Sequence, residues 1–558
     1  MNLTTYNLDP WKQLLEKATQ TWQEINFLER LLKKDFTLWK EKDQEISSRL
    51  GWIDSPLRMQ PLLDTYHSEA EKLKAAGINL LVLLGMGGSS LAPEALSKII
   101  GPQPGFPALL MLDSTSPSAV QRVAQLTAKN PQKTLFIVSS KSGTTTETLS
   151  FLNYFYHQQK EISGTEAGRY FMAITDPGTP LENLAKQLGF SQIIRGFPEV
   201  GGRFSALSPF GLFPAALMGF DLKKFLEPAV ESYQLLKAGS ELHPGLTLGA
   251  TLGCLAQAGQ DKLTLIIPSA FMSLGRWLEQ LIAESTGKEG RGILPVIESL
   301  PLSEDSYSPD RLFVFYELES EPNAFWRQKL ESFKKHGWPL IHLSGQKEEL
   351  AGHFYLWELA TAAAGYFLKI NPFDQPDVEL TKEKTKKILQ SKESRFSTAT
   401  LPKIGEGNFL TELKTFLERR GPKTGYLALL CFLTPDDNLE VALNNLARQL
   451  SEKYHLPCIW NYGPAYLHST GQLYKGDSGQ GMFISLMADD PVEAPIPSLP
   501  ESPALAASFK QLFIAQALAD FEALREKGRR ILSIRLADNP VESIFILSEV
   551  VRNQYRPA

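Results

Sequence analysis

A run of hydroxyl-bearing residues directly after an apolar segment is the stretch of this sequence best suited to chemistry. It spans Phe136 to Thr148, reads FIVSSKSGTTTET, and predicts a buried strand followed by a loop and a helix. Backbone N–H groups at a helix N-terminus, together with hydroxyls of the preceding loop, can hold a phosphate. The sequence has no Walker pattern, which favours a sugar phosphate over a nucleotide. The candidate ligands are Ser140, Ser142, Thr144 and Thr145, with Lys141 beside them.

Two glycine-rich segments are further candidates for loops that bind a ligand. LVLLGMGGSSLAP (81–93) predicts a strand that leads through Gly88 and Ser89 into a helix. A dinucleotide fingerprint is the rival interpretation, because Asp113 ends the next strand, but Ser90 replaces its third glycine. GGRFSALS (201–208) places Gly202 and Arg203 among glycines and hydroxyls. Its alternative interpretation is a capped helix start with an exposed arginine.

A carboxylate ends one apolar helical stretch. Glu284 opens the sequence ESTG after the helical pattern from Leu274 to Ile282, so it is placed at a helix end beside a glycine turn. Such a glutamate can serve as a catalytic base. The competing interpretation is a solvated carboxylate paired with Lys288 four residues later.

The elements that must position these residues alternate between strand and helix patterns. Five strands are predicted between Asn79 and Gly219, and a second round runs from about 245 to 385. Such alternation predicts an α/β protein with two doubly wound parallel sheets. We predict four parts: an N-terminal helical segment (1–70), a first sheet domain (71–230), a second (231–390), and a C-terminal α/β extension (391–558). Gln390 to Lys403 is polar and aperiodic, and is interpreted as a linker.

Length and composition exclude several classes of protein. A chain of 558 residues is too long for one core. Its net charge of −5 gives no electrostatic footprint for nucleic acid, and three cysteines do not suggest a disulfide framework. We find neither a signal-peptide pattern nor an eighteen-residue apolar run. The expectation is a cytoplasmic protein that does not enter a membrane.

At this point the sequence resembles the glucose-6-phosphate isomerase family, whose members have a sugar-isomerase (SIS) fold. Five motifs occur in the family's order: GMGGSSLAP at Gly85, SKSGTTTET at Ser140, GGRFSALS at Gly201, ESTGK at Glu284, and INPFDQPDVELTK ending at Lys382. The resemblance covers roughly residues 75 to 390. More narrowly, the sequence is similar to the isomerase half of bacterial transaldolase fusion proteins. These share a C-terminal motif that here reads GPAYLHSTGQLYKG (463–476).

The resemblance implies a role for each matching residue. The 140–145 loop and Ser89 would hold the substrate phosphate, and Arg203 would lie near the reacting carbons. Glu284 would move a proton between C2 and C1 through a cis-enediol, while Gln375 and Lys382 would contact sugar hydroxyls and the ring oxygen. The family needs no metal or cofactor.

The family also uses a histidine to open the sugar ring, in a segment that this sequence lacks at the usual place. His468 is our preferred replacement, because His followed four residues later by Gln-Leu echoes the family's pattern. His353, in GHFYLWE, is the second candidate. Alternatively, the ring opens spontaneously or with Lys382 alone.

The implied function is interconversion of glucose 6-phosphate and fructose 6-phosphate in glycolysis and gluconeogenesis. Two alternatives stay open: an isomerase that also accepts mannose 6-phosphate, and a non-catalytic SIS-type sensor of sugar phosphates. The resemblance further implies a homodimer whose residues cross between subunits, although the extension could supply His468 within one chain. Association with a separate transaldolase is a weaker expectation.

Overall fold

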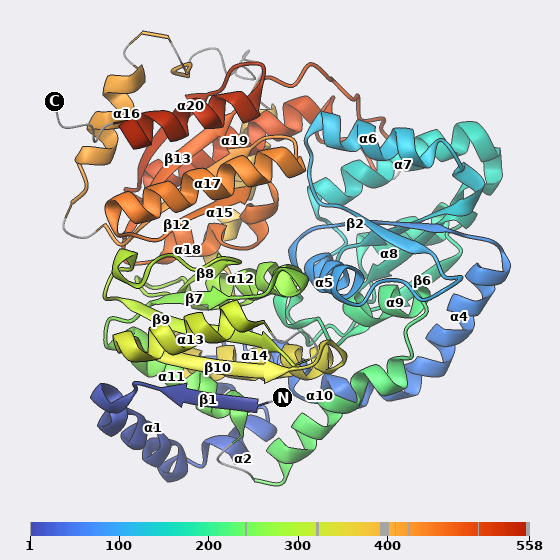
Figure 1. The fold of residues 1–558 in the computed structure, drawn as a ribbon. Coiled ribbons are helices and arrows are strands. Elements are labelled where there is room, and N and C mark those ends of the chain that lie inside the picture. Colours follow the sequence, from blue (N-terminus) through green and yellow to red (C-terminus); the bar gives the residue numbers. More distant parts are fainter. Residues whose placement is uncertain are drawn as a thin grey trace.

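Three separate β-sheets organise the computed structural model of the chain (Figure 1). It describes residues 2–239, 243–319, 323–390, 401–404, 406–407, 409–421, 424–499 and 502–553. The predicted linker 390–403 therefore lies mostly outside the described residues. Among the helices of these ranges, none combines the length and apolar character needed to cross a lipid bilayer.

The first sheet contains the five parallel strands that the sequence predicts, and the structure gives their order as β3-β2-β4-β5-β6. Both of its faces are buried, because successive residues of β2 and β4 enter two different hydrophobic clusters. Its strands are β2 (Leu80–Gly85), β3 (Ala108–Leu112), β4 (Thr134–Ser139), β5 (Phe171–Thr175) and β6 (Gln192–Arg195).

The second sheet has the order β1-β10-β9-β7-β8 and differs from the prediction at both edges. β1 (Asn2–Tyr6) runs antiparallel to β10, so the segment 1–70 is not wholly helical. β1 is a short, polar edge strand (NLTTY) that pairs only with β10. Its sequence therefore shows only a weak alternation of apolar and polar residues, the signal by which a strand is predicted. β8 (Leu294–Glu298) was not predicted, since a five-residue strand containing proline gives little signal. The inner strands are parallel: β7 (Lys262–Ile266), β9 (Arg311–Leu318) and β10 (Leu340–Gly345).

The third sheet belongs to the C-terminal region and is parallel, in the order β12-β11-β13-β14. It lies within the segment predicted as a C-terminal α/β extension, and its strands are β11 (Tyr426–Phe432), β12 (Cys458–Tyr462), β13 (Gly481–Met487) and β14 (Arg530–Arg535). This region is not a loosely attached extension. Ile496, Leu499 and Phe509 pack into the core of the first sheet, and residues of β8 share a cluster with β11 and β13.

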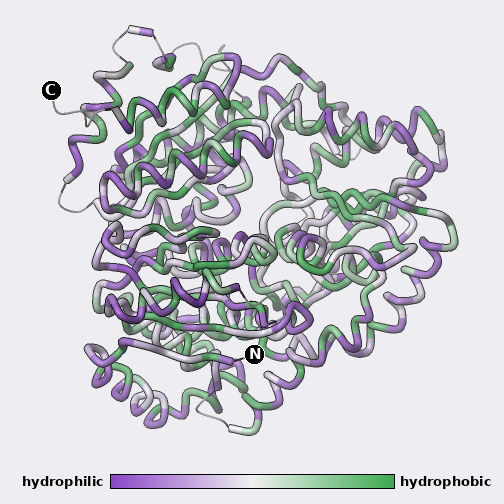
Figure 2. The backbone as a smooth tube through the Cα atoms, in the orientation of Figure 1, coloured by the Kyte–Doolittle hydropathy of each residue, from purple (hydrophilic) through white to green (hydrophobic). Residues whose placement is uncertain are grey.

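Helices surround and connect the three sheets, and the outer ones alternate hydrophilic and hydrophobic residues (Figure 2). The N-terminal helices pack on the core, as predicted, with Trp22 4.9 Å from Phe367 between ring centres. They are α1 (Lys12–Glu24), α2 (Phe27–Leu32), α3 (Ser55–Met59) and α4 (Leu63–Ala75). Around the first sheet are α5 (Leu91–Ile99), α6 (Pro117–Thr127), α7 (Thr146–Ser163), α8 (Pro180–Gln187) and α9 (Pro209–Leu217).

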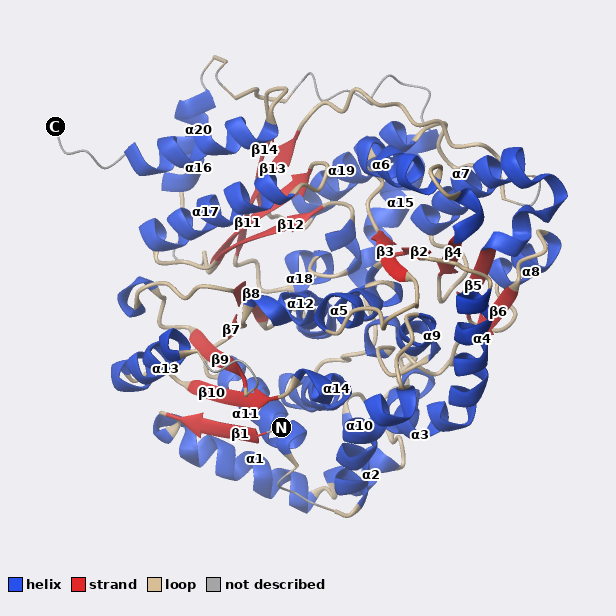
Figure 3. Ribbon diagram, turned by 45° about the vertical axis from the view of Figure 1, so that its right-hand side comes forward, coloured by secondary structure: helices blue, strands red, loops and turns tan. Residues whose placement is uncertain are grey.

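The helix α12 (Met272–Thr286) occupies the centre of the molecule and contacts elements of all three regions (Figure 3). A side chain on α12 can therefore contact residues from each of the three regions. The other helices after α9 are α10 (Leu222–Lys237), α11 (Pro244–Gln257), α13 (Ala324–His336), α14 (Leu350–Leu368), α15 (Pro376–Gln390), α16 (Phe409–Glu418), α17 (Asp437–Tyr454), α18 (Gly471–Gly476), α19 (Phe509–Glu526) and α20 (Pro540–Asn553).

Candidate active site

The hydroxyl-rich loop lies between the end of β4 and the N-terminus of α7. Gly143 adopts a left-handed conformation (φ 67°), which lets the chain turn back toward the helix. The Oγ of Ser140 lies 2.9 Å from the Oγ1 of Thr145, and Ser142 and Thr144 make a similar pair at 2.9 Å. The four hydroxyls therefore gather where the dipole of an 18-residue helix favours an anion.

Lys141 is held away from these hydroxyls by other partners. Its ammonium forms an ion pair with Asp176 and donates to the carbonyl oxygens of Phe197 (3.3 Å) and Pro198 (3.1 Å). Burial lowers the pKa of Lys141, and Asp176 only partly opposes that effect. Contact between Lys141 and a substrate phosphate stays a prediction.

A second cluster gathers around the buried guanidinium of Arg203, in the 3-10 helix Gly202–Phe204. Its Nη1 lies 3.4 Å from Glu284 Oε1 and donates to Gln375 Oε1 at 3.0 Å. Nε donates to Ser285 at 2.8 Å, and Nη2 to the carbonyls of Pro372 and Asp374, both at 2.8 Å. The arginine is thus buried rather than an exposed residue after a helix cap. Four hydrogen bonds and the ion-pair contact hold the guanidinium in place beside Glu284.

Glu284 does not pair with Lys288, which was the competing interpretation. Lys288 instead forms an ion pair with Asp374 at 2.8 Å, and burial lowers the pKa of its ammonium to about 8. The second oxygen of Glu284 accepts a hydrogen bond from Gln280 at 3.1 Å. The carboxylate is therefore held by neighbours on its own helix and by Arg203.

Two glycines bring the first sheet's loops against each other. A Cβ on Gly88 would lie 2.1 Å from the carbonyl oxygen of Gly202. Only glycine allows this approach, so the 3-10 helix Gly87–Ser89 contacts the one that carries Arg203.

His468 reaches the same cluster from the C-terminal region. It ends the 3-10 helix Ala465–His468, and its Nε2 lies 2.9 Å from Glu147 Oε1 in the first turn of α7. Its carbonyl oxygen accepts from Gln280 at 2.7 Å, so one glutamine side chain contacts both Glu284 and the His468 backbone. Burial raises the pKa of Glu147, but the imidazole of His468 outweighs it and the pKa is lowered overall.

The remaining candidates lie elsewhere or make other contacts. Lys382 is 55% exposed and pairs with Glu379 at 2.7 Å, one turn earlier on α15. His353 is buried in α14, with its ring against those of Phe271 and Tyr316. Among the described residues, His468 rather than His353 is linked to this cluster, because Gln280 donates both to the His468 backbone and to Glu284.

The motif GPAYLHSTGQLYKG attaches this histidine to α12. Gln472 accepts from the backbone N–H of Asp377 (2.9 Å) and donates to the carbonyl of Gly287 (2.9 Å). A Cβ on Gly287 would lie 2.3 Å from Leu473 Cα, so the glycine after ESTG permits close contact with α18. The motif thus fixes the C-terminal region at the end of α12 that carries Glu284.

Glu147 and Gln280 were missed as site residues. Glu147 stands inside SKSGTTTET but was interpreted only as an acid in the first helical turn. Gln280 lies one turn before Glu284, and that spacing on one helix face was the available signal.

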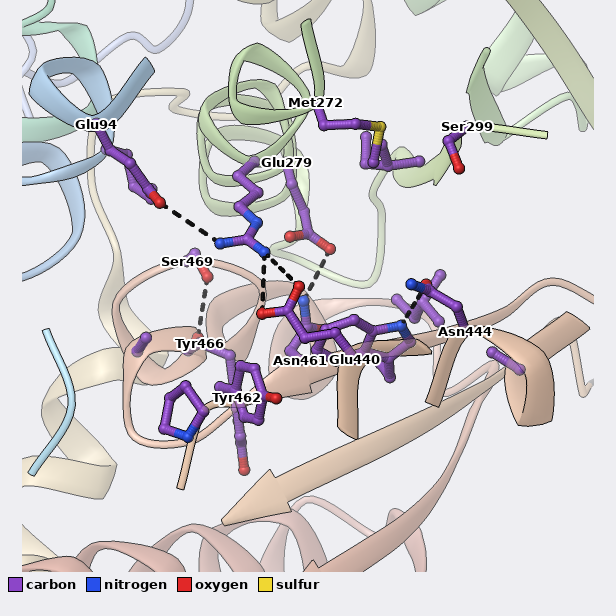
Figure 4. Close-up of a pocket in the computed structure, with 18 of the residues that line it drawn as sticks. Glu94, Met272, Glu279, Ser299, Glu440, Asn444, Asn461, Tyr462, Tyr466 and Ser469 are labelled. Atoms are coloured by element: carbon purple, nitrogen blue, oxygen red, sulfur yellow. Dashed lines mark hydrogen bonds and ion pairs between the residues drawn. The ribbon is translucent and has the colours of Figure 1, made fainter. Parts of the chain in front are cut away.

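A separate cavity of about 530 Å³ borders α12 where β3, β8 and β12 form edges of their sheets (Figure 4). At its centre, Arg276 contacts Glu94 at 3.5 Å and Glu440 at 3.2 Å. Glu279 accepts from Asn461 at 2.9 Å, and burial raises the pKa of Glu279 to about 7. Neither Glu284 nor Arg203 lines this cavity.

Comparisons with known proteins identify the family of this chain. The family model described as phosphoglucose isomerase matches residues 57–290. A glucose-6-phosphate isomerase from Mycoplasmopsis pulmonis is 31% identical over 389 residues, covering 62% of this chain and 90% of the relative. Another glucose-6-phosphate isomerase, from Thermus thermophilus, is 30% identical over 409 residues, covering 62% of this chain and 92% of that relative.

Solved structures share the fold. A hypothetical protein, also from Thermus thermophilus, superposes with a TM-score of 0.60 at 26% identity, covering 70% of this chain and 100% of that one. A glucose-6-phosphate isomerase from Chlamydia trachomatis gives a TM-score of 0.54 at 18% identity, covering 69% of this chain and 88% of that one. Fold and site thus define an α/β protein of the sugar-phosphate isomerase class. The chain belongs to the glucose-6-phosphate isomerase family.

Proposed function

We propose that this chain is an enzyme that interconverts glucose 6-phosphate and fructose 6-phosphate. The observation that carries the proposal is the contact of 3.4 Å between Arg203 and Glu284, two residues from separate regions that are both buried. A carboxylate beside a fixed cation suits a reaction in which a proton leaves carbon and negative charge develops on the neighbouring oxygen.

The phosphate of the substrate binds at the hydroxyls of Ser140, Ser142, Thr144 and Thr145. Glu284 removes the proton from C2 of the open-chain aldose and returns it to C1, while the O2 proton moves to O1, so the step consumes no net proton. Arg203 stabilises the enediolate, because its guanidinium is held in place before charge develops. Gln375 and Lys382 contact the sugar.

His468 opens the ring in this proposal. Carboxylates only accept hydrogen bonds, so its Nε2 must carry the proton that faces Glu147. In the neutral ring this leaves the Nδ1 lone pair, for which the described residues provide no hydrogen-bond partner. That nitrogen can accept the anomeric hydroxyl proton and return the same proton to the ring oxygen as the bond between C1 and the ring oxygen breaks, so the step consumes no net proton.

Conversion of fructose 6-phosphate to glucose 6-phosphate, coupled to NADP reduction in EDTA, tests the assignment. We expect the wild type to be active and Glu284→Gln to lose at least about a thousandfold in kcat, because the amide keeps the shape but not the basicity. Binding of the sugar phosphate should change little.

Glu279→Gln is the matched control, since Glu279 lies on the same helix but lines the separate cavity. It should retain activity. A Glu284→Gln variant as active as the wild type would exclude Glu284 as the base. Binding without turnover in the wild type would favour the sensor.

A further inference from the structure

A chain of buried polar side chains leads from the first sheet through the C-terminal region to His468. Thr115, just after β3, has its Oγ1 2.7 Å from Gln516 Oε1 on α19. Gln516 Nε2 lies 2.6 Å from Glu147 Oε1, the same oxygen that His468 contacts at 2.9 Å. Thr115, Gln516 and Glu147 are each at most 5% exposed.

The chemistry of these groups fixes the orientation of the Gln516 amide. Its carbonyl oxygen can only accept, so the Thr115 hydroxyl must donate to it. The NH₂ group then faces Glu147, whose carboxylate can only accept. A flipped amide would place two acceptors 2.6 Å apart. Each donor in the chain therefore meets one acceptor.

This arrangement decides how the carboxylate of Glu147 lies. Two N–H donors, from Gln516 and His468, converge on Oε1. Without Gln516, the imidazole is the one remaining side-chain hydrogen-bond partner of this carboxylate among the described residues, and the carboxylate can rotate about its last bond. His468 would then lose the fixed acceptor that keeps Nε2 protonated and turns Nδ1 toward the substrate.

We propose that Gln516 is a positioning residue for ring opening, acting through Glu147 on His468. The proposal rests on the proposed function. It gives α19 a role in the reaction although no residue of that helix is expected to touch substrate. Nothing in the sequence around Gln516 indicates this role.

The test compares three variants in the coupled assay. Gln516→Met keeps the length of the side chain but cannot donate, and we expect kcat/KM to fall about tenfold, as for loss of a hydrogen bond to a charged group. Thr115→Val removes only the hydroxyl that orients the amide, and its kcat/KM should fall about threefold. Gln511→Met, on the same helix, is the control and should match the wild type.

A kinetic isotope effect separates positioning from general damage. With glucose 6-phosphate deuterated at C2, slower ring opening makes proton abstraction less rate-limiting, so the isotope effect on kcat should shrink in Gln516→Met. Structural damage that slows every step alike would leave it unchanged.

Gln516→Glu adds a pH signature. A protonated carboxyl can donate to Glu147 as the amide does, whereas an ionised one cannot, so its activity relative to the wild type should fall as the pH rises. The charged groups that the structure describes near this pair are His468, Lys382, which acts on Glu147, and Asp113, which interacts with His468. Asp520, one turn after Gln516 on α19, is paired with Lys475. None of them is altered by the substitution, so the wild-type profile serves as the reference.

The outcomes are distinguishable. An inactive wild type would overturn the proposed function and this inference together. An active wild type with unchanged kcat/KM and isotope effect in Gln516→Met would overturn only the positioning role. If thermal unfolding shows that Gln516→Met does not fold, Thr115→Val decides in the same way.

Discussion

At the scale of single residues, the imidazole of His468 is the group whose proposed role is most separable from that of Glu284. Ring opening and C2 proton transfer are successive steps with different catalysts. We expect His468→Ala to lose about a hundredfold in the rate at which it interconverts the α and β anomers of glucose 6-phosphate. Nuclear magnetic resonance exchange spectroscopy measures that rate. Exchange of the C2 proton on the open-chain form should survive.

His157→Ala is the control, because His157 is exposed on α7. Equal losses of ring opening and of open-chain proton exchange would mean that the substitution damages the site as a whole, and would contradict a specific role. Glu147→Gln should resemble His468→Ala, since an amide could present its NH₂ group to Nε2 and favour the other tautomer.

Sequence reasoning at this scale succeeded where a residue's neighbours are local. The hydroxyls at 140–145 gather because a strand, a glycine and a helix follow one another directly. It failed for Glu147, because the histidine that defines its role lies 321 residues further along the chain. Only the fold brings those two residues together.

At the scale of elements, α14 shows why a histidine in an apolar helix need not be catalytic. Both ring nitrogens of His353 are buried without a hydrogen-bond partner among the described residues. Burial lowers the pKa of His353 to about 4. In the unfolded chain the imidazole binds a proton near pH 6.5, so folding loses stability as the pH falls from 6.5 toward 4.

We expect His353 to account for about 2 kcal/mol of the stability lost between pH 8 and pH 5. His353→Leu, which fills similar space without a titratable group, should lack that part of the loss. Urea unfolding at the two pH values measures it. If the variant and the wild type lost the same amount of stability between pH 8 and pH 5, the assignment to His353 would be contradicted.

Other elements were predictable to the extent that they are buried on both sides. The inner strands of all three sheets are mostly apolar, and they lie in the segments for which the sequence predicts α/β structure. β1 and β8 lie at sheet edges, where partner and register depend on the rest of the fold. The edge strands of the first sheet, β3 and β6, were nevertheless found, because helices alternate with them along the chain.

At the scale of the whole molecule, a single chain brings together the residues proposed for proton transfer and for ring opening. The C-terminal region supplies His468 and Gln516, while α12 and the first sheet supply Glu284, Arg203 and Glu147. Family resemblance suggests a homodimer with residues crossing between subunits, and association of this chain stays a prediction. The geometry instead favours sites that are complete within each subunit.

Mixing two inactive variants distinguishes these arrangements. We expect co-expressed Glu284→Gln and His468→Ala chains to remain as inactive as the variants alone, because each site keeps one defect when both residues come from the same chain. If sites were shared between subunits, random pairing would make half of the dimers mixed, each with one intact site, and about a quarter of wild-type activity would return. Wild type co-expressed with Glu284→Gln is the reference for equal expression of the two chains and should give about half the activity in either arrangement. Recovery to about a quarter would therefore show that His468 acts on the partner's substrate.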